Sequence, residues 1–435
     1  MTALLTDLYE ITMAYGYWKE GLSSMESVFH LFFRKKPFGG EYAVAAGLGT
    51  ALELLEKFHF SESDLKYLES LKLFEPKFLE ELSKFKLTCD IDAVPEGTVI
   101  FPYEPILRVK GPIIQAQLLE SLLLNIINFQ TLIATKASRI CKAAAPDPVV
   151  EFGLRRAQGI DGALSATRAA FIGGCTSTSN VLAGKMFGIP VKGTHAHSWI
   201  QAFPSEMEAF EAWRRCMPHN LVFLLDTYDT LRAAKRVVEV AKKFKLEKFG
   251  VRLDSGDLAT LSRAVRKILD DGGFKNCFIM ASNELNEEII ADLKRQGACI
   301  DLWGVGTHLV TGQSQPALDG VYKLAAVRNS RADPWIFKVK KSEQIAKVTD
   351  PGVLQVRRYA EEDVIYNIEG SHPRAGGEDL LIPVWRDGKA VVKLPSLLQS
   401  QQHAQEELKK FSLQHPVSHE KSLKELKMKL LGEVS

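Results

Sequence analysis

The sequence has almost no excess of charge and few cysteines, and both deficits limit what the chain can bind. Its 55 lysines and arginines nearly balance 53 aspartates and glutamates, which leaves a formal net charge of +2. A nucleic-acid or membrane partner normally requires a concentrated basic face, so the composition gives no reason to expect either. The six cysteines are scattered without a Cys-x-x-Cys pair, which argues against a structural zinc site and a disulfide framework.

Long uninterrupted apolar runs are also missing. The most apolar stretch, residues 118–135, contains Glu120, Asn125, Asn128 and Gln130, which is typical of a buried amphipathic helix and not of a membrane span. The first residues carry neither a basic segment nor a long apolar segment, so no secretory signal is predicted. We therefore expect a cytoplasmic protein with no membrane partner.

What is present, from about residue 147 to 310, is a regular alternation of apolar runs and helical stretches. β-branched runs cover residues 148–155, 188–195, 221–228, 248–256, 276–283 and 299–307, and helices are predicted at 229–245, 257–273 and 286–297. Repeated βα units favour a parallel sheet, and six in series favour a barrel over an open sheet. The predicted fold class is therefore α/β, with an irregular (β/α) barrel as the core at residues 126–340.

The flanks of this core differ in pattern. Residues 1–125 mix helical stretches with a strand-rich section, punctuated by proline and glycine, at residues 91–112. Residues 341–435 contain short strands and turns, and the last thirty or so predict an amphipathic helix with solvated charges.

Strongly polar or small residues follow each of the six apolar runs, where the predicted strands end. Because the carboxyl ends of parallel strands converge on one opening, we expect these residues to share it. The set comprises Arg155, Arg156, Thr194, His195, His197, Asp226, Arg252, Asp254, Ser255, Ser282, Asn283, Gly304, Gly306 and Thr307. Any one of them could be a helix cap or a turn residue, but six consecutive strand ends of this kind favour a functional group.

The chemistry of this set predicts a phosphorylated sugar with a second anionic group as the ligand. Residues 303–312 offer glycines and backbone N–H groups suited to a phosphate. Arg252 can fork onto a phosphate or a carboxylate, while Asp254 can accept hydrogen bonds from ribose hydroxyls.

His195 and His197 stand two positions apart, and the sequence leaves their chemistry open. On a strand this spacing puts both side chains on one face, as a shared metal requires, with Asp226, Asp254 or His308 as a third ligand. Alternatively, one histidine acts as an acid, a base or a nucleophile beside the phosphate, and the other is packed and hydrogen-bonded.

With these residues placed, the chain resembles nicotinate phosphoribosyltransferases over nearly its whole length. The strings that carry the resemblance are TDLY (6–9), EFGLRRAQG (151–159), GTHAHSW (193–199), LLDTYDT (224–230), RLDSGDL (252–258) and GVGTHLVTG (304–312). The resemblance implies a type II phosphoribosyltransferase-like fold, in which both chain ends build an α/β domain beside the barrel. It also implies head-to-tail homodimers with active sites at the subunit interface.

The resemblance further implies an activity, cofactors and roles. Nicotinate and 5-phosphoribosyl-1-pyrophosphate would give nicotinate mononucleotide and pyrophosphate, with ATP hydrolysis and Mg²⁺, as the first step of NAD salvage from nicotinate. His197 would be phosphorylated from ATP and oriented by Asp226, and no residue is predicted to ligate a metal. The substrate-binding residues implied are Tyr9 and Phe152 as stacking rings, Thr194, Arg252 and Arg155 at nicotinate, Asp254 at the ribose hydroxyls, and Ser282, Asn283, Gly304, Gly306 and Thr307 at the 5-phosphate.

Three alternatives remain. Nicotinamide-specific relatives carry an aspartate where this chain has Ser179, and an aspartate would accept from the carboxamide and repel a carboxylate, so Ser179 favours nicotinate. A binding relative that has lost turnover is the second alternative, although His197, Asp226, Arg252 and Asp254 are all present. The third is a metal-dependent hydrolase that uses His195 and His197.

Overall fold

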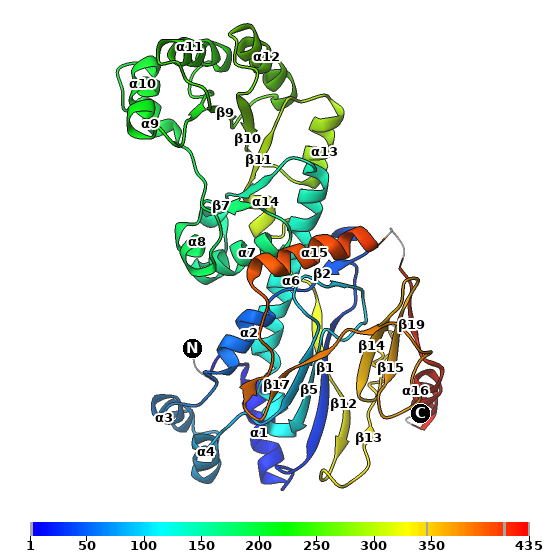
Figure 1. Cartoon of the computed structure of the whole chain (residues 1–435). Helices are drawn as coiled ribbons and strands as arrows, with labels where there is room; N and C mark the ends of the chain where they lie inside the picture. Colours follow the sequence, from blue (N-terminus) through cyan, green and yellow to red (C-terminus); the bar gives the residue numbers. More distant parts are fainter. Residues whose placement is uncertain (1–2, 345–346, 412–414, 434–435) are drawn as a thin grey trace. The chain divides into compact units, whose positions relative to one another are not determined.

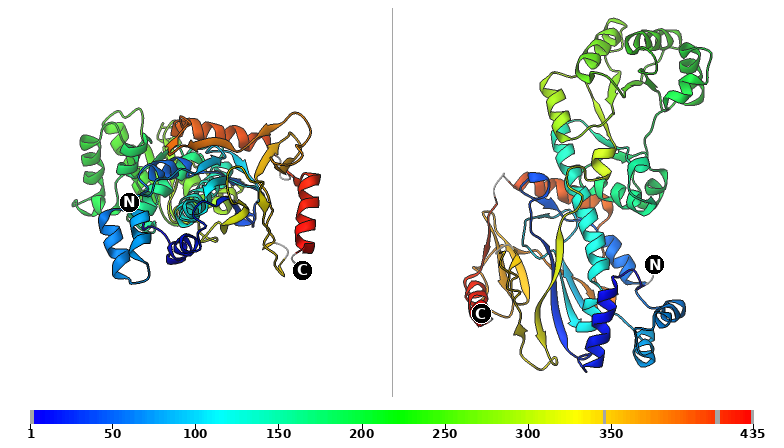
Figure 2. Two further views of the ribbon diagram at one scale, coloured as in Figure 1. Left: turned by 90° about the horizontal axis from the view of Figure 1, so that it is seen from below. Right: turned by 180° about the vertical axis from the view of Figure 1, so that it is seen from behind.

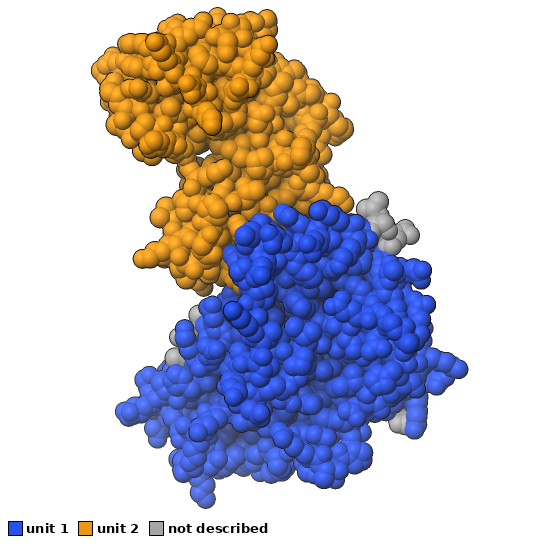
Figure 3. All heavy atoms as spheres, in the orientation of Figure 1, with its two compact units in different colours: residues 1–135, 317–435 blue, residues 136–316 orange. Residues whose placement is uncertain are grey.

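The computed structural model describes residues 3–344, 347–411 and 415–433, and the chain divides into two compact units (Figure 3). Unit 1 comprises residues 1–135 and 317–435, and unit 2 comprises residues 136–316. Each unit has its own sheets and is described by itself. Unit 1 therefore contains residues from both ends of the chain.

Unit 1 is built on a mostly antiparallel sheet with the order β13-β12-β1-β5-β3-β17-β18. Its central strand β1 (Glu26–Phe33) is rich in aromatic and branched residues and is buried along its whole length. β1 pairs antiparallel with β5 on one side and with β12 on the other, with a register shift between Val28 and Phe29. The other strands are β3 (Asp90–Ala93), β5 (Leu107–Pro112), β12 (Gly320–Arg328), β13 (Ile336–Phe337), β17 (Ile382–Arg386) and β18 (Lys389–Ala390).

Smaller sheets and helices complete unit 1. One sheet has the order β16-β14-β15-β19, from Glu378–Asp379, Leu354–Arg358, Asp363–Asn367 and Val417–His419, and β2 (Ala43–Val44) pairs with β4 (Val99–Ile100). Helix α16 lies beside β15 (Figures 1 and 2). The helices are α1 (Leu8–Lys19), η1 (Pro37–Gly39), α2 (Leu48–Leu55), α3 (Glu62–Ser70), α4 (Pro76–Ser83), α5 (Ile113–Gln117), α15 (Leu397–Lys410) and α16 (Lys421–Glu433).

The apolar stretch at 118–135 forms most of α6 (Glu120–Ala144), as predicted. The helical stretch from Ile113 to Ala144 is long and apolar enough to cross a membrane by length and composition, but 67% of its apolar window is buried inside the protein. This burial is what a core helix requires.

Unit 2 is a six-stranded parallel sheet with the order β7-β6-β11-β10-β9-β8 (Figure 1). The strands are β6 (Val149–Glu151), β7 (Ser177–Thr178), β8 (Val222–Leu224), β9 (Gly250–Leu253), β10 (Phe278–Ala281) and β11 (Leu302–Val305). The helices are η2 (Leu154–Arg156), α7 (Ile160–Ile172), α8 (Val181–Phe187), α9 (His197–Gln201), α10 (Glu206–Cys216), α11 (Thr230–Lys243), α12 (Leu258–Asp271), α13 (Glu287–Arg295) and α14 (Thr307–Val310).

The three predicted helices of unit 2 are confirmed as α11, α12 and α13. Asp229 and Asp257 cap α11 and α12 by accepting from backbone N–H groups of the first turn. Five regularly spaced residues of α11 are fully buried, which is the apolar face that its sequence pattern predicted.

Four details differ from the prediction. The run at 188–195 forms only an isolated bridge between Val191 and Thr178, and the short strand β7 takes its place. Among the described strands no ladder joins β7 to β8, so the closed barrel stays a prediction. The core ends before 340 because β12 pairs with β1 of unit 1. The predicted C-terminal helix is two helices with β19 between them, and its residues 412–414 and 434–435 lie outside the described residues.

Candidate functional site

The predicted polar residues of unit 2 meet at Asp254, just beyond the carboxyl end of β9. The Ser282 hydroxyl, beyond β10, donates to Asp254 Oδ1, and Arg252 Nη2 lies 3.4 Å from Asp254 Oδ2. His197 Nε2 lies 3.9 Å from the same Oδ2 oxygen. Four residues from three separate parts of the chain therefore form one connected group, as the convergence of strand ends predicts.

His197 is the first residue of α9, and its side chain is 40% exposed. A hydrogen bond of 3.1 Å joins its Nδ1 to the Thr227 hydroxyl. The imidazole is therefore held at one nitrogen by a neutral hydroxyl, while its other nitrogen faces a carboxylate at longer range. Thr227 was not among the predicted residues; its position directly after Asp226 in the LLDTYDT string is the signal that could have identified it.

Asp226 does not contact His197, contrary to the prediction that it orients this imidazole. Its Oδ2 accepts from the backbone N–H of Asp254, at 3.0 Å, and from the Ser255 hydroxyl. Asp226 therefore fixes the loop that carries Asp254, and Asp254 is the carboxylate beside His197. The other oxygen, Asp226 Oδ1, is buried and has no hydrogen-bond partner among the residues that the structure describes.

Arg252 and Thr194 are connected directly, as residues that share a ligand would be. Arg252 Nη1 donates to the Thr194 hydroxyl, and Arg252 Nε is buried without a hydrogen-bond partner in the described part of the chain. An unpaired buried guanidinium N–H costs free energy unless a ligand satisfies it. The pair is therefore suited to an anionic group such as a carboxylate.

Both ring nitrogens of His195 are engaged by the backbone. Its Nε2 accepts from the Leu224 N–H at 3.3 Å, and its Nδ1 lies 3.3 Å from the Ala196 carbonyl oxygen. Burial lowers the pKa of His195 to about 4, so the ring is neutral near pH 7. Because both ring nitrogens are used, the geometry does not support a metal shared by His195 and His197.

Glu151, a residue that the sequence did not single out, holds the backbone at Gly153 and at Ser179. The buried Glu151 carboxylate accepts from the Thr178 and Thr167 hydroxyls, at 2.6 and 2.9 Å, and from the Gly153 N–H. Its backbone carbonyl accepts from the Ser179 N–H at 3.0 Å. A carboxylate inside the apolar run PVVEFG is the sequence signal, because a buried charge requires several hydrogen bonds.

Gly304, predicted at the 5-phosphate, lies within β11 against the Phe152 ring. A Cβ at Gly304 would lie 2.8 Å from Phe152 Cδ2 and 2.8 Å from Met280 Cε. The absence of a side chain at Gly304 therefore leaves the space that the Phe152 ring occupies, whether or not Gly304 also contacts a phosphate.

The remaining predicted phosphate residues lie on two loops that a contact between Glu284 and His308 connects. Asn283 and Glu284 both have positive φ, and Glu284 lies 3.2 Å from Nε2 of His308, next to Thr307 in α14. Gly306 is the N-cap residue of the same short helix. The two loops are therefore placed to face a common ligand.

Two predicted residues stand apart from this group. Arg155 is exposed in η2. Tyr9 belongs to unit 1, on α1, with its ring 44% exposed. Burial and the neighbouring Glu120, with which Tyr9 shares a hydrogen bond, raise the pKa of the phenol, so it stays protonated. Tyr9 therefore presents a neutral aromatic surface to solvent.

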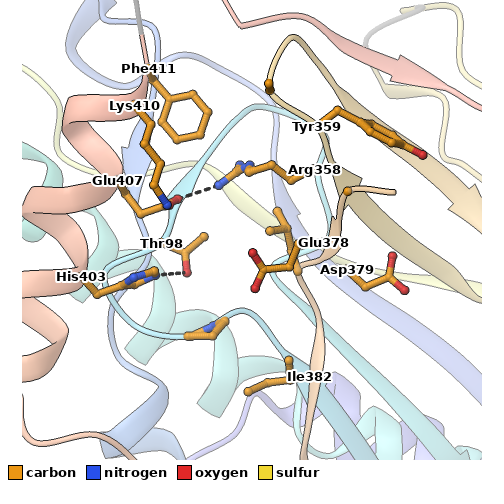
Figure 4. Close-up of a pocket in the computed structure, with 14 residues that line it drawn as sticks. Thr98, Arg358, Tyr359, Glu378, Asp379, Ile382, His403, Glu407, Lys410 and Phe411 are labelled. Atoms are coloured by element: carbon orange, nitrogen blue, oxygen red, sulfur yellow. Dashed lines mark hydrogen bonds and ion pairs between the residues drawn. The ribbon is translucent and has the colours of Figure 1, made fainter. Parts of the chain in front are cut away.

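A cavity of about 430 Å³ lies in unit 1, between α15, the end of β14 and the β16–β17 turn (Figure 4). Arg358 donates to Glu407 at 2.8 Å and to Asp363, and the Phe411 ring covers its guanidinium. Because these charges are matched within the protein, we assign the cavity no part in the chemistry of unit 2.

A larger cavity, of about 930 Å³, lies within unit 2 and reaches the predicted ligand residues. Phe152 and Thr194 line it together with apolar residues of the parallel strands, among them Val150, Val222, Phe278 and Met280. Polar and charged side chains line it as well, namely Lys192, His219, Asn220, Glu247, Lys248 and Asn276, and a mixed apolar and polar lining is usual for a small-molecule site. The polar lining also includes Thr194, whose hydroxyl binds Arg252.

Comparisons with known proteins agree with the resemblance. A family model described as the nicotinate phosphoribosyltransferase (NAPRTase) N-terminal domain matches residues 4–128. Nicotinate phosphoribosyltransferase of Bacillus subtilis is 47% identical over 359 residues, which cover 82% of this chain and 73% of the relative. A nicotinate phosphoribosyltransferase of Mycobacterium tuberculosis is 46% identical over 393 residues, covering 89% and 83%. The crystal structure of human nicotinic acid phosphoribosyltransferase has a TM-score of 0.84 at 30% identity, and the match covers 98% of this chain and 100% of that one.

Proposed function

The chain belongs to the nicotinate phosphoribosyltransferase family and is an enzyme of that activity, and we propose that it couples the transfer to ATP through His197. Nicotinate and 5-phosphoribosyl-1-pyrophosphate give nicotinate mononucleotide and pyrophosphate. The observation that carries the proposal is the connected group His197, Asp254, Arg252 and Thr194, which meets the larger cavity at Thr194. In this proposal the parallel sheet of unit 2 would form the irregular barrel.

Nicotinate would place its ring against Phe152 and its carboxylate toward Arg252 and Thr194. The unpaired Arg252 Nε is a donor that such a carboxylate would satisfy. Ser179 carries no charge, so it leaves the carboxylate unopposed, whereas an aspartate there would repel it.

Transfer of the ribosyl group develops positive charge on the sugar and negative charge on the leaving pyrophosphate. Asp254 is the carboxylate that would face the sugar hydroxyls and tolerate the cationic ribose. The loops with Ser282, Asn283, Gly306 and Thr307 would receive the 5-phosphate. The pyridine nitrogen attacks as a free lone pair and requires no general base.

The residues present fit a requirement for Mg²⁺ supplied with the substrate. Among the described residues no three His, Cys, Asp or Glu side chains gather to hold a metal by themselves. Mg²⁺ commonly uses one or two carboxylates together with substrate phosphates, and the unpartnered Asp226 Oδ1 is such a carboxylate oxygen. Asp226 would hold the ion, which would neutralise charge on the pyrophosphate.

In the ATP-dependent step, His197 would take up the γ-phosphoryl group as ADP leaves. The Thr227 hydroxyl can accept a hydrogen bond from Nδ1–H, and this tautomer leaves the Nε2 lone pair as the nucleophile. The nearby Asp254 would stabilise the positive charge on the imidazole while the phosphoryl group is transferred. Later hydrolysis of the phosphohistidine to inorganic phosphate would complete the cycle.

A homodimer with shared sites is part of the proposal. Unit 2 exposes large apolar side chains at Leu154, Ile160, Val181 and Leu182, on the segments that follow Phe152 and Ser179. Unit 1 exposes Leu5, Leu8, Tyr9 and Met13 in and before α1. Exposed apolar patches of this kind are typical of interfaces, and a second copy would bring Tyr9 to the nicotinate ring.

The test is product formation from phosphoribosyl pyrophosphate with nicotinate or nicotinamide, each with and without ATP. Wild type, His197→Ala and a matched control, His59→Ala, are compared; His59 is in unit 1, with its Nδ1 hydrogen-bonded to the Lys57 carbonyl. We expect mononucleotide from the acid, with stimulation by ATP that only His197→Ala abolishes. A preference for the amide would move the chain to the nicotinamide-specific alternative, and no product from either would favour a binding relative.

A further inference from the structure

The segment 190–196 closes the gap between β7 and β8 with different bonds on its two sides. On the β7 side the bonds are ordinary backbone pairs: Thr178 N–H donates to the Pro190 carbonyl at 3.0 Å, and Lys192 N–H donates to the Thr178 carbonyl at 2.9 Å. On the β8 side the bonds are made by two side chains, those of Asn220 and His195. Asn220 Nδ2 donates to the Gly193 carbonyl at 2.8 Å, and His195 accepts from the Leu224 N–H.

The ring of His195, which forms one of these two bridges, is fixed by its surroundings. His195 is 5% exposed, and its ring meets Trp213 edge to face at 4.8 Å between centroids. Since the Leu224 N–H donates to Nε2, the ring proton is on Nδ1, toward the Ala196 carbonyl. One neutral imidazole thus satisfies a backbone N–H of β8 and a carbonyl of the segment that precedes α9.

The two neighbours of this bridge carry the proposed chemistry. Thr194, one residue before, donates its hydroxyl to the His195 carbonyl and accepts from Arg252. His197, two residues after, begins α9, and Ala196 between them is the N-cap residue of that helix. A displacement of His195 would therefore move the phospho-acceptor and one nicotinate contact together.

We infer that His195 is a positioning residue, which replaces the missing backbone ladder between residues 190–196 and β8 and thereby sets His197 in line with its phosphoryl donor. The inference rests on the proposed function of His197. It assigns Asn220 the same task at the other end of the segment. The side chain does not touch substrate, so its effect passes through His197.

The experiment follows incorporation of phosphate from [γ-³²P]ATP into the full-length protein, together with ATP-free turnover and the ADP formed per mononucleotide. In His195→Ala the phosphorylation rate is expected to fall by about 10- to 100-fold, because misplacement of a reacting group by about 1 Å costs that much. This fall should exceed the loss of ATP-free turnover, and ADP per mononucleotide should fall. A change that only loosened the fold would reduce both rates together.

Two further variants keep the test decisive if His195→Ala folds poorly. His195→Gln places an acceptor where Nε2 lies and should recover most of the phosphorylation rate. Asn220→Asp removes the donor to Gly193 at nearly the same size and should reduce the rate.

The outcomes separate this inference from the function on which it rests. Wild-type protein without label would refute the phosphohistidine and the inference with it. Label that is lost in His197→Ala but incorporated at the wild-type rate in His195→Ala and Asn220→Asp would refute only the positioning role. Label found on His195 itself would also refute it.

Discussion

The substitution Gly304→Ala distinguishes two possible roles of this glycine. The glycine either leaves space for the Phe152 ring or contacts the 5-phosphate through its backbone. The new Cβ would lie 2.8 Å from the ring carbon Cδ2 and 2.8 Å from Met280 Cε, so the ring must move. An aromatic stacking contact contributes about 0.5–1.5 kcal/mol beyond burial. At about 1.4 kcal/mol per factor of ten, its loss raises KM for nicotinate by roughly 2- to 13-fold.

The assay measures KM for nicotinate and for phosphoribosyl pyrophosphate in wild type, Gly304→Ala and the control Gly162→Ala. Gly162 lies in α7 with nothing within 4 Å of an added Cβ, so its substitution should leave both constants unchanged. Overpacking should lower the free energy of unfolding of Gly304→Ala by about 1–3 kcal/mol. A lower melting midpoint would show this loss. If only the KM for phosphoribosyl pyrophosphate increased, Gly304 would not serve to make space for the Phe152 ring, and a contact to the 5-phosphate would be favoured.

Three further predictions concern single residues. In Ser179→Asp the ratio of kcat/KM for nicotinate over nicotinamide falls at least about tenfold, since a carboxylate now faces the acid; an unchanged ratio would remove Ser179 from the pocket. Asp226→Asn raises the Mg²⁺ concentration needed for half-maximal activity by about 10- to 100-fold, and an unaltered Mg²⁺ titration contradicts the assignment. His30 is buried and accepts from the Leu354 N–H, and burial lowers its pKa from 6.5 to about 3. The unfolded chain therefore takes up this proton first, so stability is full above pH 6.5 and falls by about 2 kcal/mol from pH 7 to pH 5. His30→Gln should flatten this dependence, as melting midpoints at the two pH values would show; an equal slope would contradict it.

Those elements that depend on short sequence patterns could be predicted from the sequence alone. The helices after β8, β9 and β10 follow from 3.6-residue periodicity and from Asp229 and Asp257 as caps. The convergence on Asp254 follows from the rule that parallel strands end at one edge. Both are properties of short windows or of a whole fold class, which is why they can be predicted without coordinates.

The features that the sequence did not predict depend on pairs of residues far apart in the chain. The hydrogen bond from the Leu224 N–H to the His195 ring joins residues 29 positions apart in the chain. No local sequence pattern indicates such a bond. The partners of Asp226 and His197 depend on loop geometry within about 1 Å. By contrast, the break in the C-terminal helix had a signal in Pro416, which disfavours a continuous helix.

The pairing of β1 with β12 has a consequence for the order in which the chain folds on the ribosome. β5 is made soon after β1, whereas β12 begins only at Gly320, after all of unit 2. At about 5–20 residues per second, one edge of β1 waits roughly 15–60 s for its partner. During that time a strand that includes Phe29, Leu31 and Phe33 presents an open edge. Nascent unit 1 is therefore the part of this enzyme that most needs a chaperone, and unit 2 can be complete before unit 1 closes.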